Sequence, residues 1–242
     1  MQELRLDQRI KQTIDLFISG LRDVYNDALV SVIIYGSASS GEFIERHSNL
    51  NLLVILKDTG LDNLKKASRL AGSSKFRMIN PLFFTEDYIR HSCDVFPIEF
   101  MDMRENYAVL YGKDVLKDIR IDLKNLRFQC EHELKAKLIN IKLRYLAAGG
   151  KKSLLEELLL KSFVSVIHIL RSVLKLKGRQ PAYRKTDVLK ELADEFKIDA
   201  VAWGKILAAR NKQVKLNSRD VEQLFAGFMA DLERITEAID KL

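Results

Sequence analysis

Residues 35–56, YGSASSGEFIERHSNLNLLVIL, decide the fold class of this chain. Gly36 and Ser37 follow an apolar run that starts at Leu29, and a second apolar run starts at Leu50. Both runs have the length and composition of buried strands. A glycine between them lets the backbone approach a ligand closely, and Ser37 offers a hydroxyl and an N–H at a helix start, where phosphate is favoured. The stretch predicts a strand, a ligand-facing turn, a short helix through residues 41–45 and a second strand.

Two asparagines, Asn49 and Asn51, lie where the second strand begins. Because side chains alternate along a strand, both are expected on the same face of the sheet. Metal chemistry would require carboxylates at such a pair, since magnesium prefers carboxylate and phosphate oxygens. The pair therefore predicts the geometry of a metal site without its charge.

The arrangement resembles the nucleotidyltransferase superfamily typified by DNA polymerase β, especially its small bacterial branch of antibiotic and minimal nucleotidyltransferases. The motif of that family is an apolar residue, Gly, Gly or Ser, nine to thirteen residues, then Asp, apolar, Asp or Glu, apolar. Here Tyr35-Gly36-Ser37 is followed after eleven residues by Asn49-Leu50-Asn51-Leu52. The resemblance covers roughly residues 20–115 and implies the family's fold, with both acidic positions replaced by asparagine.

The resemblance also implies further site residues. A third carboxylate comes from a later strand in the family, and Glu99 in DVFPIEFMDM is the best match to it. Gly36, Ser37, Arg46 and Lys161 are the implied nucleotide contacts, against the alternative that Arg46 and Lys161 are ordinary solvent-facing charges.

Loss of both charges predicts an inactive site with no bound metal. At ~4 Å and an effective dielectric near 20, each pair of unit charges contributes about 4 kcal/mol, which an amide does not supply. Three alternatives stay open. In the first, Glu42, Glu45 or Glu99 supplies a replacement metal ligand, and Mg²⁺ and an NTP are then cofactors. In the second, the two asparagines were introduced by engineering. In the third, Asn49 and Asn51 are ordinary polar residues at a strand end.

Composition limits the class of protein. The chain has 242 residues, of which 47% are hydrophobic and 30% charged, so it can bury a large core. No apolar run reaches the roughly 18 residues of a membrane span, and the charged N-terminal stretch does not resemble a signal peptide, so we expect a cytoplasmic protein without a membrane partner. Cys93 and Cys130 are far apart and indicate neither a zinc site nor a disulfide framework.

Hydrophobic periodicity changes near residue 120 and predicts an α+β chain of two domains. Residues 1–120 alternate short β-rich runs (VSVIIYG, NLLVIL, RMINPLFF and PIEFMDM) with helical segments such as 2–28 and 61–71, which is typical of a nucleotidyltransferase-like mixed sheet with flanking helices. Residues 121–242 have helical spacing and predict an all-α bundle of four or five helices. Asn217 or Ser218 is the expected N-cap of the last helix, and His168 and Trp203 are expected in the core.

Charge is unevenly divided between the two halves. Residues 1–120 hold 16 Lys and Arg against 17 Asp and Glu, and residues 121–242 hold 24 against 16, for net charges of −1 and +8. A basic half attracts nucleotides, nucleic acid or acidic proteins, although helix surfaces are commonly rich in Lys and Arg. The segment LAARNKQVKLN also resembles the HEPN helical family through Arg210-Asn211, but Lys215 stands where its ribonucleases have a histidine.

These observations predict a nucleotidyltransferase-fold protein that binds a nucleotide or regulates a partner and is catalytically impaired. The alternative is a working enzyme that moves a nucleoside monophosphate from an NTP to a small-molecule or protein hydroxyl. RNA binding, or a role in a toxin–antitoxin pair, is the weaker alternative. The long amphipathic helices equally suit a homodimer.

Overall fold

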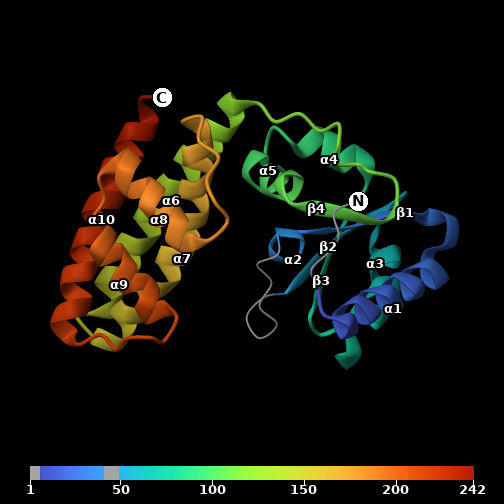
Figure 1. Cartoon of the computed structure of the whole chain (residues 1–242), viewed down its shortest axis with the longest axis horizontal. Coiled ribbons are helices and arrows are strands. Elements are labelled where there is room, and N and C mark those ends of the chain that lie inside the picture. The colour runs from blue at the N-terminus through green and yellow to red at the C-terminus, as the bar shows by residue number, and fades with distance from the viewer. Residues whose placement is uncertain (1–5, 41–48) are drawn as a thin grey trace. The chain divides into compact units, whose positions relative to one another are not determined.

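A four-stranded mixed sheet organises the first half of the chain (Figure 1). The computed structural model describes residues 6–40 and 49–242. The strand order is β3-β2-β1-β4; β1 is antiparallel to both β2 and β4, and β2 is parallel to β3. The strands are β1 (Leu29–Tyr35), β2 (Leu50–Leu56), β3 (Ile79–Phe84) and β4 (Tyr107–Gly112). The predicted α+β class with a mixed sheet is confirmed.

Both faces of the sheet are covered, which explains why its central strands are almost wholly apolar. On one face, Ile34 and Leu52 pack with Phe17 and other residues of the first helix. On the other, Leu53 packs with Phe100 and the segments that follow β3. Helices α1 and α3 therefore lie on one side of the sheet, and α4 and α5 lie on the other (Figure 1).

Short polar caps set the starts of several of these helices. The Asp7 side chain accepts from the Arg9 N–H at the start of α1, and the Thr85 hydroxyl accepts from the Tyr88 N–H at the start of α4. The described helices of this half are α1 (Gln8–Tyr25), η1 (Asn26–Ala28), α2 (Ser37–Ser40), α3 (Leu61–Ala71), η2 (Ser74–Phe76), α4 (Glu86–Ser92) and α5 (Pro97–Glu105).

One predicted strand was wrong. The run PIEFMDM forms helix α5 instead of a strand. Pro97 is at the start of this helix, where its missing N–H leaves no intrahelical bond unmade, and Phe100 and Met103 recur at helical spacing to pack on the sheet. The strand beside β1 is instead β4, which the sequence analysis missed.

The second half forms a helical unit in which every residue is described. The structure divides into compact units Met1–Ile121 and Asp122–Leu242. Phe163, Trp203 and Phe228 form the centre of the helical unit, with ring centroids 5.2–6.1 Å apart. Its helices are α6 (Leu123–Ala148), α7 (Lys152–Leu176), α8 (Lys185–Phe196), α9 (Ala200–Arg210) and α10 (Ser218–Asp240).

Local predictions for this unit were mostly confirmed. Asn217 caps α10 in a reciprocal capping box with Asp220, and Trp203 is fully buried. His168 was expected in the core but is exposed on α7, because it lies on the opposite side of the helix from the buried stripe that contains Val166 and Leu170. Across the described residues, no helix is both long and apolar enough to cross a membrane.

Candidate functional site

The turn after β1 is held by hydrogen bonds to the start of β4. Gly36 has a φ of +79°, a region that favours glycine, and its N–H donates to the Asn106 carbonyl at 3.0 Å. The Ser39 hydroxyl lies within hydrogen-bonding distance of the Gly36 carbonyl, 2.9 Å, and of the Asn106 carbonyl, 2.5 Å. The glycine amide is therefore engaged within the fold, and the helix that Ser37 begins has only four residues.

A row of four polar side chains crosses the sheet at this end. Tyr35 of β1 is opposite Tyr107 of β4 on one side and Asn51 of β2 on the other. Asn51 is in turn opposite Asn80 of β3, and the side-chain amide nitrogen of Asn80 donates to the side-chain oxygen Oδ1 of Asn51 at 3.4 Å. Residues in register share a face of the sheet, so the four side chains form one continuous polar row.

The tyrosine end of the row is partly buried. Tyr35 and Tyr107 pack against the cluster that also holds Phe100, which places the row on the α4 and α5 side of the sheet. Burial raises the pKa of Tyr35. Burial, together with the hydrogen bond that the Tyr107 hydroxyl donates to the Asp114 carboxylate at 2.9 Å, raises the pKa of Tyr107 to about 12. Both phenols therefore stay neutral at physiological pH.

The predicted site residues are only partly brought together. Gly36, Ser37 and Asn51 meet at this end of the sheet, and Asn49 is an exposed residue just before β2. Glu99 does not lie on a strand beside β2: it is exposed in the first turn of α5. The strand beside β2 instead carries Asn80 at the register of Asn51.

Asn80 is the residue that sequence reasoning missed. It lies in RMINPLFF, a run correctly predicted as a strand, but only the pairing of β3 with β2 shows that Asn80 faces Asn51. The signal available in the sequence was an asparagine within a run predicted to be a strand.

The amides do not fit a divalent cation. Magnesium takes carboxylate and phosphate oxygens, whereas Asn51 and Asn80 are neutral and bond to each other. The part of the chain that the structure describes contains no group of three His, Cys, Asp or Glu side chains able to hold a metal ion. Arg46, Glu42 and Glu45 lie in residues 41–48, outside the described residues.

Lys161 lies in a cavity of the helical unit. The cavity, of about 470 Å³, is formed by α6 and α7, with Ile141 and Leu158 among its apolar residues. The Lys161 ammonium is 2.5 Å from the Glu157 carboxylate. That contact, with a smaller contribution from Arg144, lowers the pKa of Glu157. Three cations, Lys137, Arg144 and Lys161, thus line the cavity together with the Glu157 carboxylate.

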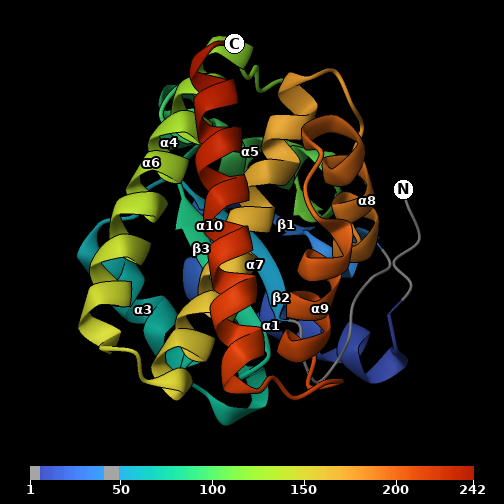
Figure 2. The same cartoon turned by 90° about the vertical axis from the view of Figure 1, so that its left-hand side faces the viewer.

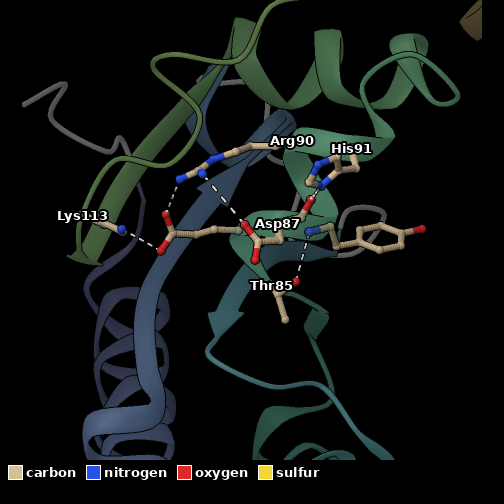
Figure 3. Close-up of polar contacts among 7 residues, drawn as sticks. Thr85, Asp87, Arg90, His91 and Lys113 are labelled. Carbon is tan, nitrogen blue, oxygen red and sulfur yellow. Dashed lines mark hydrogen bonds and ion pairs between the residues drawn. The ribbon is translucent and has the colours of Figure 1, made fainter.

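A second cavity, of about 420 Å³, lies in the sheet unit and was not anticipated. Some of its charged residues form ion pairs with one another (Figure 3). The Glu86 carboxylate contacts Lys113 at 2.6 Å and Arg90 at 3.4 Å, and Arg90 also reaches Asp87 at 3.8 Å. The lining of the cavity has as many cations (Arg90, Lys113 and Arg120) as carboxylates (Glu86, Asp114 and Asp118), so it has no net charge to attract an ionic ligand.

Comparison with known proteins finds a structural likeness and no sequence relative. No family profile matches the chain. A search of curated proteins finds no match either. A crystal structure of spectinomycin adenyltransferase AAD(9) from Enterococcus faecialis with ATP and spectinomycin matches with a TM-score of 0.60 and 12% identity, over 92% of this chain and 99% of that one. At this identity the likeness shows the fold alone: the chain shares the fold of that adenyltransferase.

Proposed function

We propose that this chain is a nucleotidyltransferase-fold protein that binds a nucleotide, or regulates a partner, and has lost catalytic transfer. Residues 1–120 act as the nucleotidyltransferase-like domain and residues 121–242 as a helical bundle domain. The observation that carries the proposal is the Asn80 to Asn51 hydrogen bond at the end of the sheet. The resemblance implies carboxylates at Asn49 and Asn51, and a further one on a later strand, a description that Asn80 fits better than Glu99.

The chemistry of the amides supports this proposal. Two carboxylates in register on neighbouring strands repel each other unless a cation lies between them. Two amides instead donate and accept, so the pair is satisfied without any ion. Because the amide pair is hydrogen-bonded without a metal ion, it does not require a bound cation for its stability.

The proposed nucleotide contacts differ in their support. Gly36 permits close approach of a ligand although its N–H is bonded to the Asn106 carbonyl, and Ser37 begins the short helix α2 directly after it. Lys161 lies in a cavity with two other cations, an arrangement that suits phosphate oxygens. The ATP in the spectinomycin adenyltransferase crystal supports a nucleotide as the ligand class. Arg46 remains a prediction outside the described residues.

Calorimetry with ATP and with GTP, each with and without magnesium, tests the proposal. We expect nucleotide affinity to be independent of magnesium in the native chain. The matched variant is Asn49→Asp/Asn51→Asp/Asn80→Asp, which restores three carboxylates and should make affinity rise at least tenfold with magnesium. A native chain that itself binds tenfold more tightly with magnesium would refute the loss of metal chemistry.

The alternative function is an active transferase in which Glu99 holds the metal. Its exposure on the α5 side of the sheet, the side of the polar row, is what keeps it in consideration. Transfer of radiolabel from an NTP by the native chain, abolished by Glu99→Gln and kept by Glu105→Gln on the same helix, would establish this alternative. The absence of transfer in all three proteins would exclude it under the conditions tested.

RNA binding by the basic half is the weaker alternative. The net charge of +8 on residues 121–242 is its basis. Phosphate contacts release counterions, so such binding would weaken steeply and linearly on a logarithmic salt scale. Affinity for a single-stranded RNA that is unchanged between low and physiological salt would count against it.

A further inference from the structure

Two cations of helix α6 differ from their neighbours because no carboxylate pairs with them. Among the residues that the structure describes, the side chains of Lys137 and Arg144 form no ion pair and no hydrogen bond. Arg127, Lys135 and Lys142 of the same helix contact carboxylates at 2.9, 2.6 and 2.7 Å. Both unpaired cations line the cavity between α6 and α7, called the α6–α7 cavity below. The fold therefore leaves positive charge unneutralised in this cavity.

Lys161 of α7 adds a third cation from the other side of the α6–α7 cavity. Only residues 149–151 join the two helices, which run side by side in opposite directions (Figure 2, α6 in yellow-green and the start of α7 in yellow). Lys161 lies eleven residues after Gly150. Arg144 and Lys137 lie six and thirteen residues before that glycine, so Lys161 is level with the segment between them. Cations from two helices therefore surround the same space.

The charge of the lining favours an anion of a particular size. Three cations and one carboxylate, Glu157, give the α6–α7 cavity a net charge of +2. The Lys161 to Glu157 pair is largely exposed, with 71% and 56% of the two side chains accessible, so water screens it and a ligand can compete for the lysine. A phosphate monoester carries a charge of about −1.5 to −2 at pH 7, which matches this excess.

A hydroxyl group in the wall of the cavity has no partner in the fold. Ser162 lines the α6–α7 cavity and is only 9% exposed. Within the described residues, its Oγ forms no hydrogen bond, and it is not among the side-chain oxygens that are sealed from solvent. The Ser165 hydroxyl, in contrast, already donates to the Ser162 carbonyl at 2.9 Å. Ser162 can therefore donate its hydroxyl proton to an oxygen of a bound anion.

Apolar side chains form much of the remaining wall. Ile141 and Leu158 are buried, and Leu154 is 43% exposed at the same cavity. Small-molecule sites combine such walls with a few polar groups in volumes of about 300–1,000 Å³. The volume of about 470 Å³ lies within this range. The lining therefore suits a ligand that joins an anionic group to an apolar or aromatic body.

We propose that the α6–α7 cavity binds a phosphate monoester with an aromatic body, without a metal ion. Lys137 and Arg144 hold the phosphate oxygens, and Ser162 donates to one of them. The aromatic body lies against Leu154 and Leu158, which removes apolar surface from water. The inference deepens the proposed function and rests on it for the choice of a nucleotide, since a nucleoside monophosphate has this chemistry.

Titration calorimetry of the full chain without magnesium tests the site, with AMP, phenyl phosphate and inorganic phosphate as ligands. Inorganic phosphate lacks the body and should bind at least about tenfold more weakly than the other two. Lys137→Gln/Arg144→Gln should raise the Kd for phenyl phosphate about 100-fold, or about tenfold for each lost charged contact. Lys124→Gln/Lys142→Gln is the matched control, because it removes two charges from the same helix outside the cavity and should change this Kd less than about threefold.

Leu154→Ser tests the apolar wall. It should raise the Kd for phenyl phosphate about fivefold and leave the Kd for inorganic phosphate unchanged, because only the body contacts this side chain. Circular dichroism and thermal denaturation confirm that each variant is folded. Equal Kd values for phenyl phosphate in the two double variants, or inorganic phosphate bound as tightly as phenyl phosphate, would overturn the proposal.

Failure of this site and failure of the proposed function give different results. Nucleotide binding that Lys137→Gln/Arg144→Gln leaves unchanged would refute the α6–α7 cavity as the site while nucleotide binding itself stands. A native chain that binds phenyl phosphate through Lys137 and Arg144 but binds neither AMP nor ATP would support the cavity and refute the nucleotide as its ligand.

Discussion

The polar row at the end of the sheet and the helical unit satisfy their polar groups in different ways. At the end of the sheet, neutral amides and phenols form a row, and Asn51 accepts from Asn80. In the helical unit, polar groups are charged and paired across helices, as in Lys205 with Asp220 at 2.7 Å. The row at the end of the sheet is therefore hydrogen-bonded without formal charge, whereas the helical unit uses ion pairs between its helices.

Destabilisation of the helical unit alone is the most severe test of this contrast. Trp203→Ala removes the largest fully buried side chain, which packs on Phe163 and Phe228 and donates from its indole to Asp231 at 2.9 Å. We expect a loss of about 3–5 kcal/mol in the free energy of unfolding of the helical unit. Hydrogen exchange should accelerate in α6–α10. Equal acceleration in the strands would show that the two units unfold together.

A milder change should return ion dependence to the sheet unit. Asn51→Asp/Asn80→Asp replaces the hydrogen bond with two like charges, and we expect a loss of about 1–2 kcal/mol without magnesium. Millimolar magnesium should recover part of this loss in thermal denaturation. Asn51→Asp alone is the control, because its carboxylate can still accept from the Asn80 amide. A double variant as stable as the native chain without magnesium would contradict the proposed repulsion.

The smallest effects are expected from pH, with opposite signs in the two units. The raised pKa of Tyr107, about 12, makes the sheet unit lose stability as pH rises from 10 to 12, because the unfolded tyrosine loses its proton first. Lys205 and the Asn217 N–H lower the pKa of Asp220, so its contribution is present above pH 4 and is lost as pH falls through that lowered value.

Denaturation at each pH limit measures this contrast. Tyr107→Phe should reduce the loss of stability at alkaline pH, and Asp220→Asn should reduce the loss of stability at acidic pH. If Tyr107→Phe changed the stability at acidic pH, or Asp220→Asn changed it at alkaline pH, the assignment of these two groups to the two units would be wrong.

The sequence predicted the fold better than it predicted the site. Apolar runs such as Leu50–Leu56 and caps such as Asn217 depend on residues that are neighbours in the chain. The sequence therefore predicted the strand and the helix that they form. PIEFMDM failed because its composition suits a strand while Pro97 and the packing of Phe100 favour a helix. Asn80 could not be placed at all, because strand pairing brings it to Asn51 across a sequence separation of 29 residues.

The mutual bond of Asn51 and Asn80 also bears on how such a site changes over generations. In the genetic code, each asparagine codon is one base away from an aspartate codon. A first replacement leaves a carboxylate beside an amide that can still donate to it, so the strand pair tolerates the step. Only the second replacement creates repulsion, and a cation relieves it. The route from the neutral amide pair to an ion-binding pair of carboxylates therefore passes through folded proteins at every stage.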